Sequence, residues 1–455
     1  MKLQVVILAA GQGTRMQSRL PKVLHPLAGK PFLEYVVDNA LALEAHDTHV
    51  VVGHGADVVQ ERLASYAVNW VQQTEQLGTG HAVAQALPAI DDDSVVLVLY
   101  GDVPLTSKDT LEELLAQVND NSLALLTVNL SNPAGYGRIV RDDDGQVLAI
   151  VEEKDASDEQ RLICEGNTGI LAVSGGKLKK WLPTLSSDNA QGEYYLTDTI
   201  AMAAADGMDV VAVFAKTEEE VQGINSRQQQ AALERWYQLQ QANALMVAGA
   251  TLADPARIDI RGKVSHGQDI YIDVNAVFEG DVSLGNDVQI GPNVHIINSS
   301  IGDGVTINAN TVIENTIIAA GCQIGPYARL RPGTRLAENA KIGNFVEIKQ
   351  ADIGPGSKVN HLSYVGDAKL GRDVNVGAGT ITCNYDGANK HLTDIGDNVF
   401  VGSNSALVAP IKVEAGATIG AGSTLSADVE AESLVVARVK PRVVRDWARP
   451  LKKPK

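Results

Sequence analysis

The fold of the C-terminal half is decided by residues 395–425, IGDNVF VGSNSA LVAPIK VEAGAT IGAGST L, in which an aliphatic residue returns every six positions. The same spacing recurs in shorter sets between Leu284 and Val365, with a slip of one residue between sets. A period of six fits neither a helix nor a flat strand and indicates a parallel β-helix. Three hexapeptides make one coil, so we expect about nine or ten coils. The pattern breaks once, at residues 382–394 (TCNYDGANKHLTD), which we expect to form a loop that projects from the solenoid.

Residues 1–225 have a different pattern of apolar residues, in which short aliphatic runs alternate with helical patterns. Runs that are apolar almost throughout are typical of parallel strands buried on both faces. The pattern therefore predicts a Rossmann-like α/β domain with a mostly parallel, doubly wound sheet. Ligands bind such sheets beyond the carboxyl ends of the strands. The predicted strands are residues 5–10, 49–52, 95–100, 123–128, 147–151, 169–173 and 210–214.

A single helix is predicted between these two halves, because residues 226–248 contain neither Gly nor Pro and are rich in Gln, Ala, Leu and Glu. We expect Leu233, Trp236, Tyr237 and Ala244 to form its buried stripe and Gly249 to end it. The predicted boundaries are 1–225 for the α/β domain, 226–249 for the linker helix, 250–437 for the β-helix and 438–455 for a basic C-terminal tail.

The composition limits the classes of function. The 455 residues carry a formal net charge of −17, which argues against a general binder of nucleic acids or anionic membranes. Cys164, Cys322 and Cys383 are widely spaced, so we expect neither a zinc site nor a disulfide framework, and we expect a cytoplasmic location. No apolar run approaches the roughly eighteen residues that cross a bilayer. The short apolar run near the N-terminus is better explained as a strand than as a signal peptide.

A glycine-rich loop follows the first predicted strand, with LAAGQGTRM at residues 8–16 and LPK at residues 20–22. Gly11 and Gly13 would let backbone N–H groups approach phosphates, and Arg15 and Lys22 would add positive charge. The spacing is neither that of a Walker A loop nor that of a dinucleotide fingerprint, and a purely structural turn is the alternative. Asp102, just past the strand at 95–100, is placed to hold Mg²⁺, although a strand-ending Asp is as often a cap or turn residue.

The loop GxGTRM with its downstream PK resembles the signature of sugar-nucleotide pyrophosphorylases. The order of motifs along the whole chain resembles a bacterial family, the bifunctional N-acetylglucosamine-1-phosphate uridylyltransferase/glucosamine-1-phosphate acetyltransferases. The further motifs that carry this resemblance are QLGTGH at 76–81, GYGR at 135–138, VE at 151–152, NTG at 167–169, QGEYY at 191–195 and GIN at 223–225.

The resemblance implies roles for the N-terminal residues. Asp102 and Asn225 would hold Mg²⁺, and Arg15 and Lys22 would neutralise the phosphates of UTP as catalytic residues. The other implied substrate-binding residues are Leu8, Ala9, Ala10, Gly11, Gln73, Gly78 and Thr79 for the uridine, Gly137, Glu152 and Asn167 for the sugar, and Tyr100 and Gly101 beside Asp102.

In the β-helix, His361 is the standout candidate for a general base, which acetyl transfer to an amine requires. A lone histidine is more often structural, but LRPG at 330–333, VNVGAGT at 374–380 and NYDG at 384–387 resemble the acetyltransferase motif of the family. The resemblance implies that His361 is the base and that the β-helix is left-handed, with a homotrimer whose active sites lie between subunits. The implied sugar-phosphate residues are Arg331, Lys349, Tyr364, Asn375, Asn384 and Tyr385, and the implied acetyl-CoA residues are Ala378, Ser403, Ala421 and Arg438.

Together the motifs predict a two-step synthesis of UDP-N-acetylglucosamine, for peptidoglycan and lipopolysaccharide precursors. Acetyl-CoA and glucosamine 1-phosphate would give N-acetylglucosamine 1-phosphate, which would react with UTP and release pyrophosphate. One alternative is a single nucleotidyltransferase activity with a β-helix that only oligomerises, but a scaffold needs neither His361 nor the projecting loop. Another is a non-enzymatic binding platform, which leaves the glycine loop and Asp102 unexplained.

Overall fold

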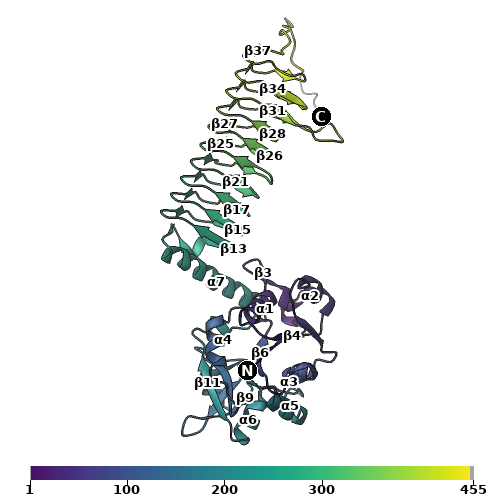
Figure 1. Cartoon of the computed structure of the whole chain (residues 1–455), viewed down its shortest axis with the longest axis vertical. Coiled ribbons are helices and arrows are strands. Elements are labelled where there is room, and N and C mark those ends of the chain that lie inside the picture. The colour runs from purple at the N-terminus through teal and green to yellow at the C-terminus, as the bar shows by residue number, and fades with distance from the viewer. Residues whose placement is uncertain (1, 451–455) are drawn as a thin grey trace. The chain divides into compact units, whose positions relative to one another are not determined.

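The computed structural model describes residues 2–450 and divides the chain into two compact units, 1–237 and 238–455. The first unit is an α/β domain, and the second is a solenoid of short parallel strands (Figure 1). Among the described residues, no helix is both long enough and apolar enough to cross a membrane.

The middle layer of the first unit is a sheet with the strand order β11-β7-β10-β6-β1-β4-β5. All of these strands point the same way except β10, which is antiparallel to both β6 and β7, and the antiparallel hairpin β8-β9 joins through β10. The sheet is therefore mixed, and the predicted strands at 147–151 and 169–173 are the ones that run against the rest. The bounds are β1 Leu3–Ala9, β4 Asp47–Val52, β5 Asn69–Gln72, β6 Val95–Tyr100, β7 Ser122–Asn129, β8 Arg138–Arg141, β9 Val147–Val151, β10 Glu165–Ser174 and β11 Asp209–Phe214, with a separate pair β2 Pro26–Leu27 and β3 Lys30–Pro31.

Helices cover both faces of this sheet, which confirms the doubly wound arrangement. Because neighbouring strand residues point to opposite faces, Val5 lies in a core with α1 and α4, whereas Val6 lies in a second core with α3, α5 and α6. Almost all of these core side chains are aliphatic. The bounds are α1 Phe32–Ala42, α2 Ala56–Arg62, α3 Thr79–Ala86, α4 Lys108–Leu115, α5 Gly175–Trp181 and α6 Asp198–Ala205.

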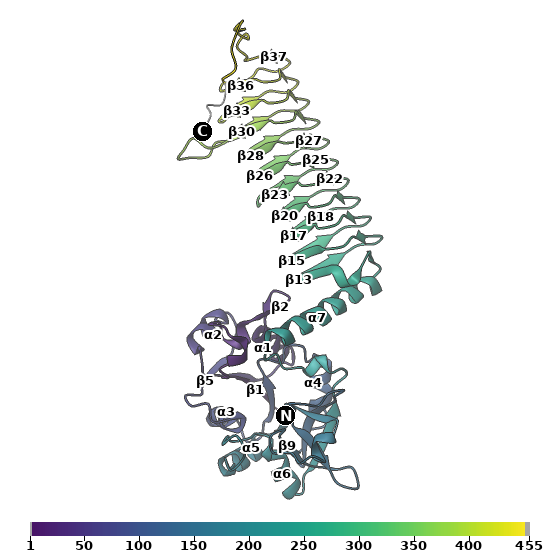
Figure 2. The ribbon, with the colours of Figure 1, turned by 180° about the vertical axis from the view of Figure 1, so that it is seen from behind.

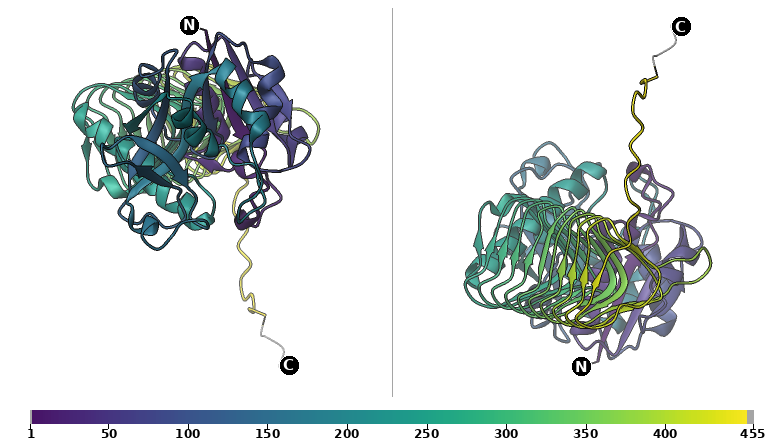
Figure 3. Two further views of the ribbon diagram at one scale, coloured as in Figure 1. Left: turned by 90° about the horizontal axis from the view of Figure 1, so that it is seen from below. Right: turned by 90° about the horizontal axis from the view of Figure 1, so that it is seen from above.

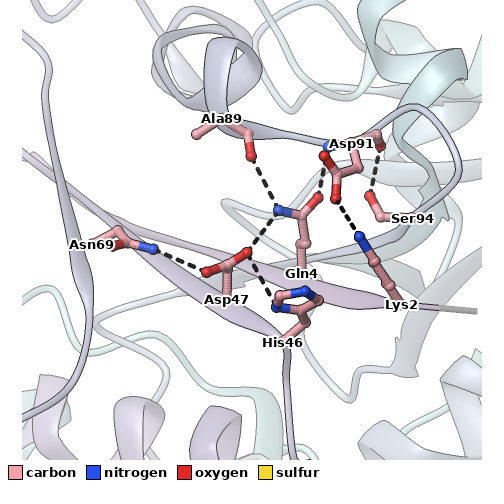
Figure 4. A network of polar contacts seen from close by, with 8 residues as sticks. All are labelled: Lys2, Gln4, His46, Asp47, Asn69, Ala89, Asp91 and Ser94. Atoms are coloured by element: carbon pink, nitrogen blue, oxygen red, sulfur yellow. Dashed lines mark hydrogen bonds and ion pairs between the residues drawn. The ribbon is translucent and has the colours of Figure 1, made fainter.

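The amino end of β1 is fixed by a polar network (Figure 4). Gln4 is buried, and its side-chain amide donates to the carbonyl of Ala89 at 3.1 Å and to Asp47 at 3.3 Å, while its oxygen accepts from the Asp91 N–H at 2.8 Å. These contacts hold β1, β4 and the loop before β6 together at one end. The glycine loop leaves the opposite end of β1.

Helix α7, Arg227–Val247, matches the predicted linker helix within one residue at each end. Leu233 is buried as expected, but Ala244 is exposed, and Ala242 and Leu245 are buried instead. The prediction of a single stripe was wrong because Leu233 belongs to the core of the first unit, whereas Leu245 belongs to the core of the second. Gly249, at φ 105°, follows the helix end as predicted.

The second unit is a parallel β-helix built from two long sheets (Figures 1 and 2). One sheet contains β12 Thr251–Leu252, β14 Tyr271–Ile272, β16 Gln289–Ile290, β19 Thr306–Ile307, β22 Gln323–Ile324, β25 Lys341–Asn344, β27 Lys358–His361, β29 Asn375–Val376, β32 Phe400–Val401, β35 Thr418–Ile419 and β37 Leu434–Val435. The other bends around two sides of each coil and contains β13 Ile258–His266, β15 Ala276–Leu284, β17 His295–Ile297, β18 Ser300–Ile301, β20 Val312–Glu314, β21 Ile317–Ile318, β23 Arg329–Leu330, β24 Arg335–Leu336, β26 Glu347–Ile353, β28 Tyr364–Leu370, β30 Ile381–Cys383, β31 Thr393–Ile395, β33 Ala406–Val408, β34 Ile411–Val413 and β36 Thr424–Leu425.

The coils stack on one another, as the view along the solenoid shows (Figure 3), and the predicted aliphatic residues occupy matching positions in successive coils. Ile290, Ile307, Ile324 and Ile342 are register partners in successive coils, and all of them are buried in one core. A coil advances by 17 residues in some steps and by 18 in others, as Ile307 to Ile324 and Ile324 to Ile342 illustrate. This difference explains the one-residue slips of the sequence pattern.

Most corners of the coils turn through residues with positive φ, a conformation that favours Gly, Asn and Asp. Two of the three corner columns hold these residues almost throughout. We call the third column the apolar corner, because bulky side chains occupy three consecutive coils. It consists of Asn275, Asn293, Asn310, Tyr327, Phe345, Leu362, Gly379, Asn404 and Gly422.

The predicted loop projects from the solenoid between β30 and β31 (Figure 2). Its turn is stabilised by Asp386, whose carboxylate accepts from the N–H groups of Ala388 and Asn389 at 2.8 and 2.7 Å and pairs with His391 at 2.6 Å. These interactions hold the pKa of Asp386 far below its usual range. The loop is narrower than the predicted 382–394, since both ends belong to strands.

Candidate active sites

The first candidate site is a pocket of about 560 Å³ at the carboxyl ends of β1 and β6, where an α/β sheet places its ligands. The structure brings most of the predicted uridine and metal residues to its wall, along with others that the sequence analysis did not single out, Gln12, Val23, Gln76, Ala82 and Glu193. The predicted residues that line it are Leu8, Ala9, Ala10, Gly11, Lys22, Gln73, Gly78, Thr79, Tyr100 and Asp102.

The glycine loop shapes this pocket through two different glycines. Gly11 has open space on its Cβ side, so its backbone is accessible from the pocket. Gly13 adopts φ 62°, and a Cβ there would lie 2.6 Å from the Cβ of Lys22. Gly13 therefore allows the loop to fold back against Lys22, which carries an ammonium group into the site.

The ammonium of Lys22 marks a cation position. Its Nζ lies 2.5 Å from Oδ2 of Asp102 and 3.0 Å from Oδ1 of Asn225, so two oxygens from distant segments converge on one point. The Lys22 and Asp102 side chains are only 13% and 15% exposed. One carboxylate and one amide oxygen suit Mg²⁺, which prefers few protein ligands and completes its shell with phosphate oxygens and water. No cluster of three or more His, Cys, Asp or Glu residues able to hold a metal occurs in residues 2–450.

The opposite wall is formed by Gln73, Gly78 and Thr79. Gln73 is 3% exposed, and its amide donates to the carbonyl of Gly78 at 3.3 Å. Gly78 has φ 113°, and a Cβ would lie 2.6 Å from the Tyr194 carbonyl, so no other residue fits there. Thr79 accepts a hydrogen bond from the N–H of Leu196 at 3.0 Å. This packing explains why the QLGTGH and QGEYY motifs occur together.

The predicted sugar residues form a second group beside the pocket. A Cβ on Gly137 would lie 3.5 Å from both Asn167 and the Glu152 carboxylate, so the three share one small space. Burial raises the pKa of Glu152, although a hydrogen bond from Thr197 at 3.1 Å opposes this effect. Burial, with the charges of Glu152 and Asp102, also raises the pKa of Tyr100, which links this group to the cation position.

The loop that bears Gly137 is held by an ion pair between a buried arginine and a partly exposed glutamate, which was not predicted from the sequence. Arg138 is 1% exposed, and its guanidinium pairs with Glu153 at 2.6 Å and donates to the carbonyl of Tyr136. Glu153 also accepts from the N–H of Gly135, and these contacts lower its pKa. The pair thus ties the GYGR motif to the chain directly after Glu152.

Besides Gly137, Glu152, Asn167 and Asn225, whose places are given above, two more predicted residues are not among those that line the pocket. Gly101 lies behind it, where its N–H donates to the Leu8 carbonyl at 2.9 Å. Arg15 is exposed on the short 3₁₀ turn Thr14–Met16. Its predicted catalytic role remains a prediction.

The second candidate site lies on the side of the β-helix that contains β26 and β28. Glu347 and Tyr364 are register partners there, and Arg331 pairs with Glu347 at 2.8 Å. This carboxylate raises the pKa of Arg331. The amine of Lys390, from the projecting loop, lowers the pKa of the neighbouring Lys349. Two cationic side chains from the coils and one from the loop therefore gather at this face, as a phosphate ligand requires.

Asn384 anchors the projecting loop to the same face. It is buried, and its amide donates to Asp367 and lies 3.4 Å from the hydroxyl of Tyr364. Tyr385 is exposed on the loop, and its hydroxyl donates to the Gly387 carbonyl at 2.6 Å. Both residues were predicted, but Asp367 was not.

His361 lies at the edge of this face, at the end of β27. Its Nδ1 lies 2.7 Å from Oδ1 of Asn344, one coil earlier. With the Nδ1 proton donated to this oxygen, the lone pair of the ring is on Nε2, which is the form that a general base needs. Asn344 was not predicted from the sequence, although the 17-residue spacing between coils points to it.

The predicted acetyl-CoA residues continue from His361 along one edge of the solenoid. Successive coils are joined there by hydrogen bonds from Gly379 N–H to His361, from Asn404 N–H to Ala378 and from Gly422 N–H to Ser403. Ala421 and Arg438 extend the line, since a Cβ on Gly422 would contact the Arg438 side chain at 3.5 Å. Four steps of about 4.8 Å give a track of roughly 19 Å, which suits an elongated ligand.

The structure separates Asn375 from the other predicted sugar-phosphate residues. Asn375 lies on β29 in one sheet of the solenoid, whereas Lys349 and Tyr364 lie on β26 and β28 in the other. The predicted role of Asn375 with these residues, in sites expected to lie between subunits, stays a prediction.

Comparison with known proteins matches both halves of the chain. Residues 5–158 match the MobA-like NTP transferase domain, residues 260–362 the GMPPB C-terminal domain and residues 393–427 the hexapeptide repeat of succinyl-transferase. These matches confirm the predicted fold class, a nucleotidyltransferase domain joined by a helix to a β-helix of hexapeptide repeats.

Full-length relatives carry one name, bifunctional protein GlmU. The protein from Marinobacter nauticus is 64% identical over 450 residues, which cover 99% of both chains. That from Cellvibrio japonicus is 61% identical over 451 residues, covering 99% of this chain and 100% of the relative. That from Pseudomonas putida strain F1 is 56% identical over 452 residues, or 99% of each. With this identity over its full length and both of its candidate sites in place, the chain belongs to the GlmU family of bifunctional proteins.

Proposed function

We propose that this chain makes UDP-N-acetylglucosamine in two steps, with acetyl transfer in residues 250–437 and uridylyl transfer in residues 1–225. The observation that carries the proposal is that one chain holds two separate groups of polar residues, one around Lys22 and Asp102 and one around His361 and Arg331. Each group contains the types of side chain that its own transfer needs, and no residue belongs to both groups.

In the uridylyl transfer, a phosphate oxygen of N-acetylglucosamine 1-phosphate attacks the α-phosphorus of UTP, and the bond to the bridging oxygen of pyrophosphate breaks. Asp102 and Asn225 would hold Mg²⁺, which supplies neutralisation of phosphate charge when bound. Lys22, now between these two oxygens, would move its ammonium to the phosphates and help to neutralise pyrophosphate as it leaves. Gln73, Gly78 and Thr79 fix the nucleoside, and Glu152 and Asn167 fix the sugar, so that the reacting atoms meet in line.

In the acetyl transfer, the amine of glucosamine 1-phosphate attacks the thioester carbonyl of acetyl-CoA. His361 Nε2 takes the proton that the amine loses, and the C–S bond then breaks to release the thiol, which His361 can protonate. Arg331 and Lys349 hold the sugar phosphate, and Tyr364, Asn384 and Tyr385 contact the sugar. The edge formed by Ala378, Ser403, Ala421 and Arg438 receives the coenzyme.

A homotrimer through the β-helix is supported by the apolar corner. Tyr327, Phe345 and Leu362 are 53%, 56% and 64% exposed at positive φ, and the first two rings stack at 5.3 Å. A bulky residue at positive φ destabilises the fold by roughly 1 kcal/mol or more. Because these three side chains are exposed, burial of apolar surface within one chain does not offset this strain. A neighbouring copy that packs against this corner would bury its apolar side chains. Because His361 directly precedes Leu362, the neighbouring copy would also place another surface beside His361. That copy would then supply Asn375, which lies in the other sheet of the solenoid from Lys349 and Tyr364.

A cytoplasmic location is supported by the cysteines. Cys164, Cys322 and Cys383 are all free thiols, and burial raises the pKa of Cys322 to about 11, so it remains protonated. Unpaired thiols are typical of a reducing compartment, which also supplies UTP and acetyl-CoA.

The proposal is tested by incubating the purified chain with glucosamine 1-phosphate, acetyl-CoA, UTP and Mg²⁺ and then omitting one component at a time. We expect UDP-N-acetylglucosamine only in the complete mixture and N-acetylglucosamine 1-phosphate when UTP is omitted. When N-acetylglucosamine 1-phosphate replaces the first two substrates, the nucleotide sugar should form without acetyl-CoA. A preparation that makes the nucleotide sugar only from N-acetylglucosamine 1-phosphate would support the alternative of a single activity with an oligomerising β-helix.

A further inference from the structure

Glu220 is a buried carboxylate in the first unit that the proposed reaction does not use. It lies in the 3₁₀ turn Glu219–Val221 and is only 5% exposed. Its Oε1 accepts from the N–H of Ser107 at 2.9 Å and from the Ser107 hydroxyl at 2.7 Å, and its Oε2 accepts from the N–H of Lys216 at 3.1 Å. Burial alone would raise its pKa, but hydrogen bonds from Thr110, Ser107 and Lys216 lower it below the usual range.

These contacts join two segments that are far apart in the sequence. Ser107 caps the N-terminus of α4 and lies five residues after Asp102. Glu220 lies five residues before Asn225. A further bond runs from the Thr106 hydroxyl to the Glu220 carbonyl at 3.2 Å. The side chain and backbone of Glu220 therefore fasten the segment after Asp102 to the segment before Asn225.

Asp102 and Asn225 are otherwise linked by one direct backbone contact, from the Ile224 N–H to the Asp102 carbonyl at 2.9 Å. Their side-chain oxygens nevertheless converge on the same Lys22 ammonium. Mg²⁺ demands near-ideal geometry, and such geometry persists only where the segments that carry the ligands are themselves fixed. The Glu220 contacts add a hydrogen-bonded clamp between these two segments.

We propose that Glu220 is a positioning residue for the divalent cation, holding the Asp102 and Asn225 segments at the separation that metal binding needs. This inference rests on the proposed uridylyltransferase site. It predicts that loss of the Glu220 charge lowers the affinity for the divalent cation, although no metal ligand is removed. A substituted protein should then recover when more metal is supplied.

The test compares Glu220→Gln with the full-length wild-type chain. Gln keeps the shape but loses an acceptor, since one of its two polar atoms is a donor. We expect the Mg²⁺ concentration for half-maximal uridylyl transfer to rise about tenfold, with kcat at saturating Mg²⁺ within about threefold of wild type. Binding of Mn²⁺ to the enzyme with UTP, followed by electron paramagnetic resonance, should weaken by a similar factor. Acetyl transfer by the same preparation should be unchanged.

Two further variants make the result decisive. Thr106→Val removes only the bond to the Glu220 carbonyl and should shift both metal measurements about threefold, so it decides the question even if Glu220→Gln does not fold. Glu34→Gln is the matched control, because Glu34 is a glutamate of α1 with a 3.1 Å ion pair to Arg62 and has no part in either segment. It should leave both metal measurements at wild-type values.

The inference is overturned if Glu220→Gln binds Mn²⁺ as tightly as wild type, or if it loses kcat without any change in metal affinity. Failure of the underlying proposal has a different result. If Asp102→Ala left Mn²⁺ binding and uridylyl transfer intact, the metal would be bound elsewhere, whatever Glu220 does.

Discussion

The two units present their candidate residues in contrasting ways. In the α/β unit, Lys22 and Asp102 are mostly buried in a pocket, and every predicted metal ligand comes from the same chain. In the β-helix, His361 is exposed, Arg331 and Glu347 are each 34% exposed, and the predicted sugar-phosphate residues are divided between two sheets. The first group of residues lies in a pocket within one fold, whereas the second lies on a surface that we propose is covered by a neighbouring copy. A pocket and a surface should therefore respond differently to substitution and to assembly.

The largest expected effect tests whether the two sites are independent. Asp102→Ala removes the one carboxylate at the cation position and should lower uridylyl transfer by about a thousandfold or more while acetyl transfer persists. His361→Ala removes the base and should lower acetyl transfer by about 10²- to 10⁴-fold while uridylyl transfer persists. Each variant is the folding control for the other in a paired assay of both products. Loss of both activities in a folded single variant would contradict the separation.

The next prediction tests whether a neighbouring copy packs against the apolar corner. Phe345→Asp places a charge at the centre of the apolar corner, so assembly through this corner should fail. Sedimentation should then show a monomer, acetyl transfer should fall about a hundredfold because the reactants are no longer held together, and uridylyl transfer should stay within about twofold. Ile317→Asp is the control, because Ile317 is also about half exposed but lies on β21, away from that corner. A monomeric Phe345→Asp protein with normal acetyl transfer would show that the surface needs no neighbour.

The difference between pocket and surface also explains what the sequence could predict. The β-helix follows from its six-residue period, α7 follows from a long segment without Gly or Pro, and the pocket residues follow from motifs at strand ends. The direction of β10 could not be predicted, because an apolar strand has the same composition in either orientation. Ala244 was misplaced because one helix serves two cores.

Contacts between coils were the harder part of the site. Asn344 and Asp367 contact His361 and Asn384 across one coil. Steps of 17 residues are interrupted by steps of 18, so the spacing to the partner of a given side chain differs by one residue between coils. Asn375 matched a motif but lies in the other sheet. Glu220 lies outside every quoted motif, and Arg138, although part of GYGR, was given no role, since the importance of both comes from which loops they join.

A smaller effect should come from the packing that completes the pocket. Gly13→Ala would place a Cβ 2.6 Å from Lys22 Cβ and would also strain a residue at φ 62°. The displaced ammonium should lower uridylyl transfer about 10- to 100-fold and leave acetyl transfer unchanged. Gly207→Ala is the matched control, because Gly207 has φ 72° but open space around its Cβ, so it carries the same backbone strain of about 1 kcal/mol without a clash. Equal losses in the two variants would mean that strain, not the contact with Lys22, causes the effect.

The smallest expected effect is on stability and concerns the clamp in the α/β unit. The pKa of Glu220 is lowered in the folded protein, so the unfolded state binds a proton more readily, and the stability that its carboxylate contributes is present above the unfolded pKa of about 4.3 and is lost as pH falls through the lower folded value. Gln cannot titrate. As the pH falls from 6 to 3, and so through the unfolded pKa, the unfolding temperature of the wild type should therefore fall by a few degrees more than that of Glu220→Gln, a shift that corresponds to about 1 kcal/mol in a domain of this size. Circular dichroism at 222 nm reports on this unit, because α1 to α6 lie within it. If the unfolding temperatures of the two proteins depended on pH in the same way, the carboxylate would make no net contribution to the stability of the pocket. The contrast between a preformed pocket and an open surface would then depend on Asp102 and its neighbours alone.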